Sequence, residues 1–201
     1  MIEQNIALAE KELKREDVFI SSTIEDLEQV RNIIKNALMD RGYNPVMSEK
    51  NNFPLDASKL QRVHSHDYCI DKLLECGSLI FIMGKEYGGK YAGNKYDQYK
   101  QEIINNSKGN IKEPSISLME FYVAIKNNLL HYAFIDKQFD NVEIRKQNWS
   151  EDIIKEYNFI NHLETDNEIN DNWISRYDGD EDLATRIKQL VFASLSKANL
   201  F

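Results

Sequence analysis

Residues 17–47 read DVFISSTIEDLEQVRNIIKNALMDRGYNPVM, and this stretch indicates the fold class more clearly than any other. The apolar run Asp17–Ser21 predicts a short buried strand. Hydroxyls at Ser22–Thr23 with acids behind them are typical of a helix N-terminus. An apolar stripe with helical spacing then runs through Leu27–Leu38, and Gly42 marks its end. The stretch therefore predicts a strand, a turn and a helix in immediate succession.

The rest of the chain continues this alternation. Further short apolar runs predict strands at Tyr43–Met47, Ser78–Met83 and Leu130–Ile135. Pro45 cannot donate a ladder hydrogen bond, so the first of these strands is expected near an edge of the sheet. Helices are predicted at residues 60–75, at 116–127, after a cap at Ser150, and at 181–197. The pattern favours an α/β fold, with a mainly parallel sheet of about five strands and helices on both faces.

The length of 201 residues and the lack of a clear domain boundary indicate that the chain forms a single domain. We expect an N-terminal arm or helix at residues 1–16, a core at 17–135 and a helical C-terminal completion at 136–201. The polar stretch 89–114 is longer than most loops in a compact domain. We therefore expect it to be an insertion loop or a lid, with a helical piece near residues 96–104.

Charge and composition exclude several classes of partner. Lys and Arg number 25 against 33 Asp and Glu, which gives a formal net charge of −8. Such a chain is poorly suited to a nucleic-acid backbone or an anionic membrane surface, although a small anion could bind locally. No window approaches ~18 apolar residues, so we expect no membrane segment. Cys69 and Cys76 are too far apart along a helix for a disulfide, which favours a reducing, cytoplasmic location.

Glu120 breaks the pattern of its own helix. It falls inside an apolar stripe, four residues after Ile116 and four before Ala124. A carboxylate in such a position costs several kcal/mol unless it is partnered or its pKa moves. One interpretation is a glutamate at the edge of the stripe that snorkels or pairs with a lysine. The other is a pocket carboxylate that interacts with a substrate hydroxyl or a developing cation, and the pattern alone leaves both open.

Three segments are expected at the carboxyl ends of the strands, where parallel sheets collect ligands. They are Ser21–Thr23, Gly84–Gly89 and the loop that enters the Glu120 helix, and they converge only if the first and third strands flank a switch point. Asp67 also interrupts an apolar stripe, on the helix before the third strand. It is either a buried residue bonded to the backbone or to the Ser21–Thr23 hydroxyls, or part of a ligand site.

Metal-binding and several catalytic motifs are absent from the pattern. His64, His66 and Cys69 match no standard zinc spacing, and no second pair follows. The Asp178–Asp182 run imitates the start of a calcium loop, but Leu183 stands where the loop needs glycine. There is no P-loop, dinucleotide fingerprint, nucleophile elbow or zincin motif. We expect no metal site.

Three blocks of sequence carry a resemblance to a known family. They are VFISSTIEDLEQVRNIIKNALMDRGYNPV (Val18–Val46), DYCIDKLLECGSLIFIMGKEYG (Asp67–Gly88) and SISLMEFYVA (Ser115–Ala124). In this order they resemble a TIR-like domain of unknown function from bacteria, which opens with a FISST strand and is often fused to NACHT ATPase or TPR regions. That family is similar in fold to TIR domains and nucleoside deoxyribosyltransferases, which implies a flavodoxin-like three-layer domain.

The resemblance also implies a site. Enzymes among these relatives place a glutamate on a helix near the pocket, and the matching residue is Glu120, with Ser117 one turn before it. Asp67 would orient the residues that bind phosphate and ribose. The implied nucleotide-binding residues are Ser21, Ser22, Thr23, Asp67, Gly84, Tyr87, Gly88 and Ser117.

The preferred hypothesis is an effector of bacterial antiviral or stress signalling that cleaves an N-glycosidic bond. NAD would be its substrate, in a glycohydrolase or ADP-ribosyl cyclase reaction that requires no cofactor. The chain would act as a homo-oligomer or with a partner effector or sensor protein. One alternative is a non-catalytic module for signalling or nucleotide sensing. Another is a nucleoside deoxyribosyltransferase-like enzyme, in which Glu120 would be a covalent nucleophile.

Overall fold

Short apolar runs form a central parallel sheet. The computed structural model describes residues 17–48, 63–165 and 174–198. The predicted N-terminal arm at 1–16 lies outside the described residues. The strands are β1 (Asp17–Ser21), β2 (Asn44–Val46), β3 (Ser78–Met83), β4 (Leu130–Asp136) and β5 (Ile174–Tyr177).

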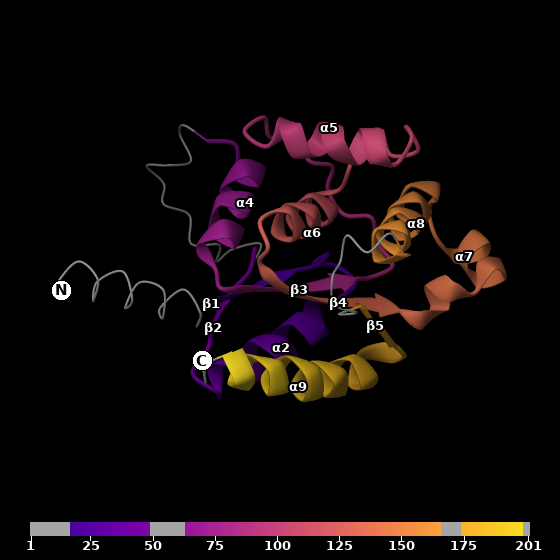
Figure 1. Ribbon diagram of the computed structural model, residues 1–201. Helices are drawn as coiled ribbons and strands as arrows, with labels where there is room; N and C mark the ends of the chain where they lie inside the picture. The colour runs from indigo at the N-terminus through magenta and orange to yellow at the C-terminus, as the bar shows by residue number, and fades with distance from the viewer. Residues whose placement is uncertain (1–16, 49–62, 166–173, 199–201) are drawn as a thin grey trace.

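Helices connect the strands and cover both faces of the sheet (Figure 1). A 3-10 turn at Lys137–Asp140 follows β4. The α-helices are α2 (Glu28–Met39), α4 (Ser65–Glu75), α5 (Asp97–Asn106), α6 (Ile116–Lys126), α7 (Val142–Asn148), α8 (Glu151–Thr165) and α9 (Gly179–Ala198).

The strand order is β2-β1-β3-β4-β5, and every pairing is parallel. This order confirms that β1 and β3 are neighbours, with the chain running outward from them in opposite directions. The crevice at such a switch point is where ligands bind in open α/β sheets. The edge position expected for the Pro45 strand is also confirmed, since β2 ends the sheet. The fold is a three-layer, flavodoxin-like α/β domain.

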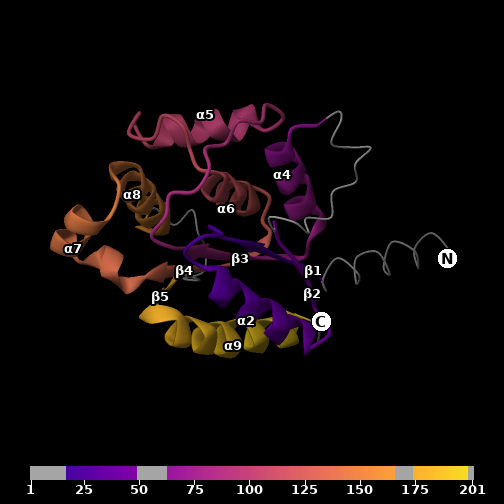
Figure 2. The ribbon, with the colours of Figure 1, turned by 180° about the vertical axis from the view of Figure 1, so that it is seen from behind.

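Alternation along the strands divides the core into two layers. Phe19, Leu79 and Phe81 pack with α4, α6 and α8 on one face. Ile20 and Ile80 pack with α2 and α9 on the other. Figures 1 and 2 show α2 and α9 side by side on their face, opposite α4, α6 and α8. Every residue of β3 is buried, as the continuous apolar run Ser78–Met83 predicts for a central strand.

The helix α5 lies on the outer side of α6, further from the sheet than the other helices (Figure 1). It is part of the 89–114 segment, and its Ile103 is fully buried. Because α6 is covered by the sheet on one side and by α5 on the other, all residues from Leu118 to Ile125 are buried. Glu120 therefore sits in a helix whose whole central stretch is buried, and not in the stripe of an amphipathic helix.

The turn after β1 differs from the sequence prediction. Ser22 and Thr23 do not cap a helix, because α2 begins only at Glu28, after an N-cap residue whose side chain makes no capping bond. The Thr23 hydroxyl instead donates to Asp26. Asp26 also accepts hydrogen bonds from the backbone N–H groups of Lys85 (2.6 Å) and Glu86 (3.2 Å). One carboxylate thus joins the turn after β1 to the turn after β3.

Three other elements were not fully predicted, and one of them is α7, which no predicted helix covers. The strand β5 has no counterpart in the sequence prediction, because ISRY is short and only partly apolar. The predicted helix at 60–75 begins at Ser65, where the His64 ring nitrogen accepts the His66 N–H at 3.2 Å. Residues 60–62 of that prediction lie outside the described residues.

We expect Ile103→Ala to lower the free energy of unfolding by about 2–5 kcal/mol, because it opens a cavity between α5 and α6. Urea denaturation would measure this loss. The matched control is Ile33→Ala, since Ile33 is 42% exposed on α2. That variant should stay within about 0.5 kcal/mol of the parent chain. Equal losses from the two variants would contradict the packing of α5 on α6.

Candidate functional site

A cleft of about 400 Å³ opens where β1, β2 and β3 end. It lies at the switch point of the sheet, so residues far apart in sequence meet there. The turns after β1 and β3, the residue Ser48 after β2, and the first turns of α6 form its walls. We call this cavity the Glu120 cleft. The residues that line it are Ser22, Thr23, Ile24, Glu25, Ser48, Glu86, Gly88, Gly89, Ile116, Ser117 and Glu120.

Glu120 lies at the floor of the Glu120 cleft and is only 4% exposed. The Ser21 hydroxyl donates a 2.5 Å hydrogen bond to its Oε2. No described residue donates to Oε1, so this oxygen is available to a ligand hydroxyl. Burial raises the pKa of Glu120 to about 7, although the Ser21 hydrogen bond and the nearby Arg31 charge both lower it. Small changes in its surroundings can therefore switch its charge near neutral pH.

Arg31 is a site residue that the sequence analysis missed. It is 3% exposed, and one guanidinium nitrogen donates to the Ser22 carbonyl (3.1 Å) and hydroxyl (2.7 Å). Its other nitrogen donates to the Ser48 carbonyl at 2.6 Å. The buried cation thus fixes two walls of the Glu120 cleft and favours the carboxylate form of Glu120. A signal was present, because Arg31 follows Leu27 by four residues and so shares its helix face.

The charge of the lining is acidic. Glu25, Glu86 and Glu120 contribute carboxylates, and no Lys or Arg is found among the described lining residues. Among the described lining residues, a positive dipole end is found at the N-terminus of α6, where Ile116 and Ser117 reach the cleft. The cleft therefore suits a polar ligand with a cationic part, and any anionic part would rely on backbone N–H groups.

The predicted site residues divide into two groups. Ser22, Thr23, Gly88, Ser117 and Glu120 line the cleft, and Ser21 contacts it through Glu120. Gly84, Tyr87 and Asp67 are not among the lining residues. A Cβ at Gly84 would collide with the Asp26 carboxylate, so its place in the fold explains this glycine. The Tyr87 hydroxyl donates to the Glu113 carbonyl and faces a separate hollow.

Asp67 holds the chain that follows Tyr91. It is 2% exposed and accepts hydrogen bonds from the Tyr91 hydroxyl and from the backbone N–H groups of Asn94 (3.2 Å) and Lys95 (3.3 Å). Within the described part of the chain, it makes no hydrogen bond with the Ser21–Thr23 hydroxyls. Of the two interpretations of Asp67, the structure supports the buried aspartate that is bonded to the backbone.

Glu156 is a second residue that the sequence analysis missed. It is 5% exposed on α8, and its two oxygens accept the Ser115 N–H (2.6 Å) and the Ser115 hydroxyl (2.8 Å). Ser115 is the N-cap of α6, and its own hydroxyl accepts the Leu118 N–H. Burial raises the pKa of Glu156 to about 8, against the effect of the Ser115 and Tyr87 donors. This carboxylate therefore fixes the end of α6 that enters the cleft.

The segment 89–114 does not cover Glu120. Only Gly89 from it is found among the described lining residues of the cleft. The rest is anchored on α4 and α6, by Asp67 at one end and by the buried Ile103 and Ile111 further along.

Within the described ranges, no group of three or more His, Cys, Asp or Glu side chains is arranged to hold a metal ion. The His66 ring instead accepts the Ala92 N–H at 3.0 Å, and His64 caps α4. Both cysteines are free thiols. In the same ranges, no helix has the length and apolar character needed to span a membrane.

The fold and the cleft define a flavodoxin-like α/β domain with a candidate ligand site at the switch between β1 and β3. The chain belongs to the family described as Domain of unknown function (DUF4062), which matches residues 17–191. This match extends beyond the three blocks of sequence noted above and includes β5 and most of α9. No curated protein and no solved structure matches the chain significantly.

The buried carboxyl of Glu120 should make stability depend on pH. An acid whose native pKa is raised binds more protons when folded, so its contribution is full below about 4.5 and is lost as pH rises to about 7. The unfolding free energy of the parent chain, relative to that of Glu120→Gln, should therefore fall by up to about 3 kcal/mol as pH rises across this window. Chemical denaturation at several pH values would measure it.

The variant Ser21→Ala tests whether the pKa of Glu120 causes this pH dependence. Removal of its hydrogen bond takes away a donor that favours the carboxylate, so the pKa of Glu120 should rise and the window should extend to higher pH. A difference that does not vary with pH would contradict the burial of Glu120.

Asp67→Ala should lower the free energy of unfolding by at least about 1–3 kcal/mol, because it leaves the buried Tyr91 hydroxyl and two backbone N–H groups without an acceptor. Thermal and urea denaturation would measure the loss. Asp97→Ala is the control, since this exposed acid in the first turn of α5 contributes at most about 1 kcal/mol. If the two variants were equally stable, Asp67 would not have the structural role described above.

Proposed function

We propose that the chain cleaves an N-glycosidic bond in a nucleotide, with NAD as substrate, in a glycohydrolase or ADP-ribosyl cyclase reaction. The observation that supports this proposal best is the buried Glu120 carboxyl at the floor of the cleft. Ser21 fixes its Oε2, and Oε1 accepts no hydrogen bond from a described residue. Such a group can hold ribose hydroxyls and stabilise the positive charge that develops on the sugar.

The proposed reaction consists of two steps, the loss of nicotinamide and the attack of water on the ribose. As the bond between C1′ and the nicotinamide nitrogen breaks, its electron pair goes to the nitrogen, and neutral nicotinamide leaves. The ribose then carries an oxocarbenium-like charge opposite Glu120. A water oxygen attacks C1′ and releases a proton to solvent, which yields ADP-ribose. In a cyclase reaction, an adenine ring nitrogen takes the place of water.

The charge of the cleft is compatible with this leaving group. Nicotinamide is a pyridinium cation while it is attached to ribose, and it needs no proton to depart. The described lining offers carboxylates at Glu25 and Glu86 beside Glu120, and no His, Cys, Lys or Arg that could act as a general acid. The phosphates of NAD would then lie at the N-terminus of α6 and the turns around Ser22 and Gly88.

We also propose, from the sequence resemblance, a role as a bacterial stress or antiviral effector in the cytoplasm. Activation would need assembly of several copies or contact with a sensor protein. Assays should therefore use concentrated protein.

Concentrated protein incubated with NAD should release nicotinamide, and Glu120→Gln should reduce the rate at least about 100-fold with the fold intact. Chromatography would identify nicotinamide and the second product. The rate of the parent chain should rise as pH rises through about 7, because the reaction needs the carboxylate form of Glu120.

The control is Glu143→Gln, which removes an exposed carboxylate on α7 and should leave the rate unchanged. Turnover retained in Glu120→Gln would contradict the mechanism. If even the parent chain releases no nicotinamide, a nucleotide-sensing module becomes the better hypothesis. A glycosyl adduct on Glu120, seen by mass spectrometry, would instead indicate the deoxyribosyltransferase-like reaction.

A further inference from the structure

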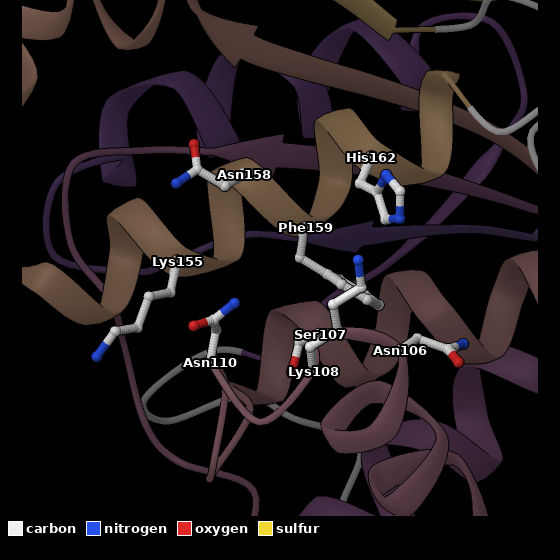
Figure 3. A pocket seen from close by; sticks show the side chains of 8 residues that line it. All are labelled: Asn106, Ser107, Lys108, Asn110, Lys155, Asn158, Phe159 and His162. Carbon is white, nitrogen blue, oxygen red and sulfur yellow. The ribbon is translucent and has the colours of Figure 1, made fainter.

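A second hollow of about 350 Å³ lies between the end of α5 and one face of α8 (Figure 3). We call it the α5–α8 hollow. It shares no lining residue with the Glu120 cleft. Its walls come from Asn106 at the end of α5, from the turn that follows, and from residues 155–162 of α8. Its volume falls near the lower end of the range of about 300–1,000 Å³ that holds small ligands.

The charge of this hollow is opposite to that of the protein. Lys108, Lys155 and His162 line it, and no Asp or Glu is found among its described lining residues. The chain as a whole carries a formal net charge of −8. A basic lining inside an acidic protein attracts a small anion locally, whereas the surrounding negative charge repels a long polyanion such as a nucleic acid.

Lys108 is the cation best placed for a ligand. Its side chain rises from the turn after α5 toward Phe159 and His162 on α8 (Figure 3). The backbone of this turn is fixed, because the Lys108 N–H donates to the Asn105 carbonyl (2.9 Å) and the Gly109 N–H to the Ile104 carbonyl (3.0 Å). Lys108 forms no ion pair within the described part of the chain.

Lys155 contributes less to the hollow. It forms an ion pair with Glu151 at 2.9 Å and points away from Lys108 and His162 (Figure 3). Its charge is therefore partly neutralised. The ammonium of Lys108 points toward the ring of His162, which lines the same space (Figure 3).

Polar and aromatic groups complete the walls. Phe159 is 4% exposed and packs on Tyr122 with ring centroids 6.0 Å apart, so it forms a fixed apolar floor. The side chains of Asn106, Asn110 and Asn158 add amides around the rim. No described residue bonds the Asn110 side-chain amide, which is therefore available to a ligand. Amides and cations around an apolar floor are the usual groups that recognise a compact, polar anion.

We propose that the α5–α8 hollow binds a small phosphorylated metabolite, with Lys108 and His162 as the main contacts to its phosphate. This proposal is independent of the proposed N-glycosidase reaction, because the two sites share no residue. AMP and pyrophosphate serve as probes, since each carries phosphate and is small enough for the hollow.

Isothermal titration calorimetry on the full chain should detect binding of both probes. The double variant Lys108→Gln/His162→Gln should weaken binding at least about tenfold, because it removes the Lys108 charge and the His162 ring that line the hollow. Both side chains are exposed, and the melting temperature without ligand is measured for each variant to verify that it is folded. Lys146→Gln is the control, since it removes one exposed positive charge on α7, outside the hollow, and should leave affinity unchanged.

Salt should weaken binding to the parent chain more than binding to the double variant, because fewer charges contact the probe in the variant. Three results would overturn the proposal. They are no binding at millimolar probe, equal affinities of the parent chain and the double variant, and a loss of binding in Lys146→Gln as large as in the double variant.

Discussion

The burial of α6 on two sides is the constraint on which the rest of the structure depends. The sheet covers one side of this helix and α5 covers the other, so every residue from Leu118 to Ile125 is buried. Any ionisable group there loses its hydration, and this is the main reason why the pKa of Glu120 rises to about 7. Ser115, the N-cap of α6, is itself buried, and Glu156 supplies the acceptors for its N–H and hydroxyl.

A second set of contacts gives the cleft its shape. Asp26 joins the turn after β1 to the turn after β3 through the N–H groups of Lys85 and Glu86. Arg31 joins the turn after β1 to Ser48 after β2. Three strand ends are thus held by two charged side chains from one short stretch of sequence. Preorganisation of this kind matters for either catalysis or binding, because the walls need little reordering when a ligand arrives.

The pattern of apolar residues along the chain predicted the strands and helices whose formation depends on neighbouring residues. The apolar runs of β1 and β3 are clear in the sequence, but the adjacency of these strands was only a condition there, because a parallel α/β pattern is compatible with more than one strand order. Glu120 was singled out correctly as anomalous, although its helix proved to be buried over a whole stretch and not along one stripe. Glu156 was missed because its partner Ser115 lies 41 positions earlier, and Arg31 because its acceptors, Ser22 and Ser48, lie outside its own helix. A short strand such as β5 carries too few apolar residues to signal itself.

The pairing of Glu156 with Ser115 has a consequence for how the chain is made. The two residues are 41 positions apart, and the later one completes the cap of the earlier helix. While the protein is being synthesised from its N-terminus, α6 can collapse onto β1 and β3 before α8 exists. Its first turn then has no acceptor from Glu156, and the entrance to the cleft is unfinished. The newborn chain therefore acquires a settled Glu120 environment only after α8 has been synthesised, as contacts between distant segments form late.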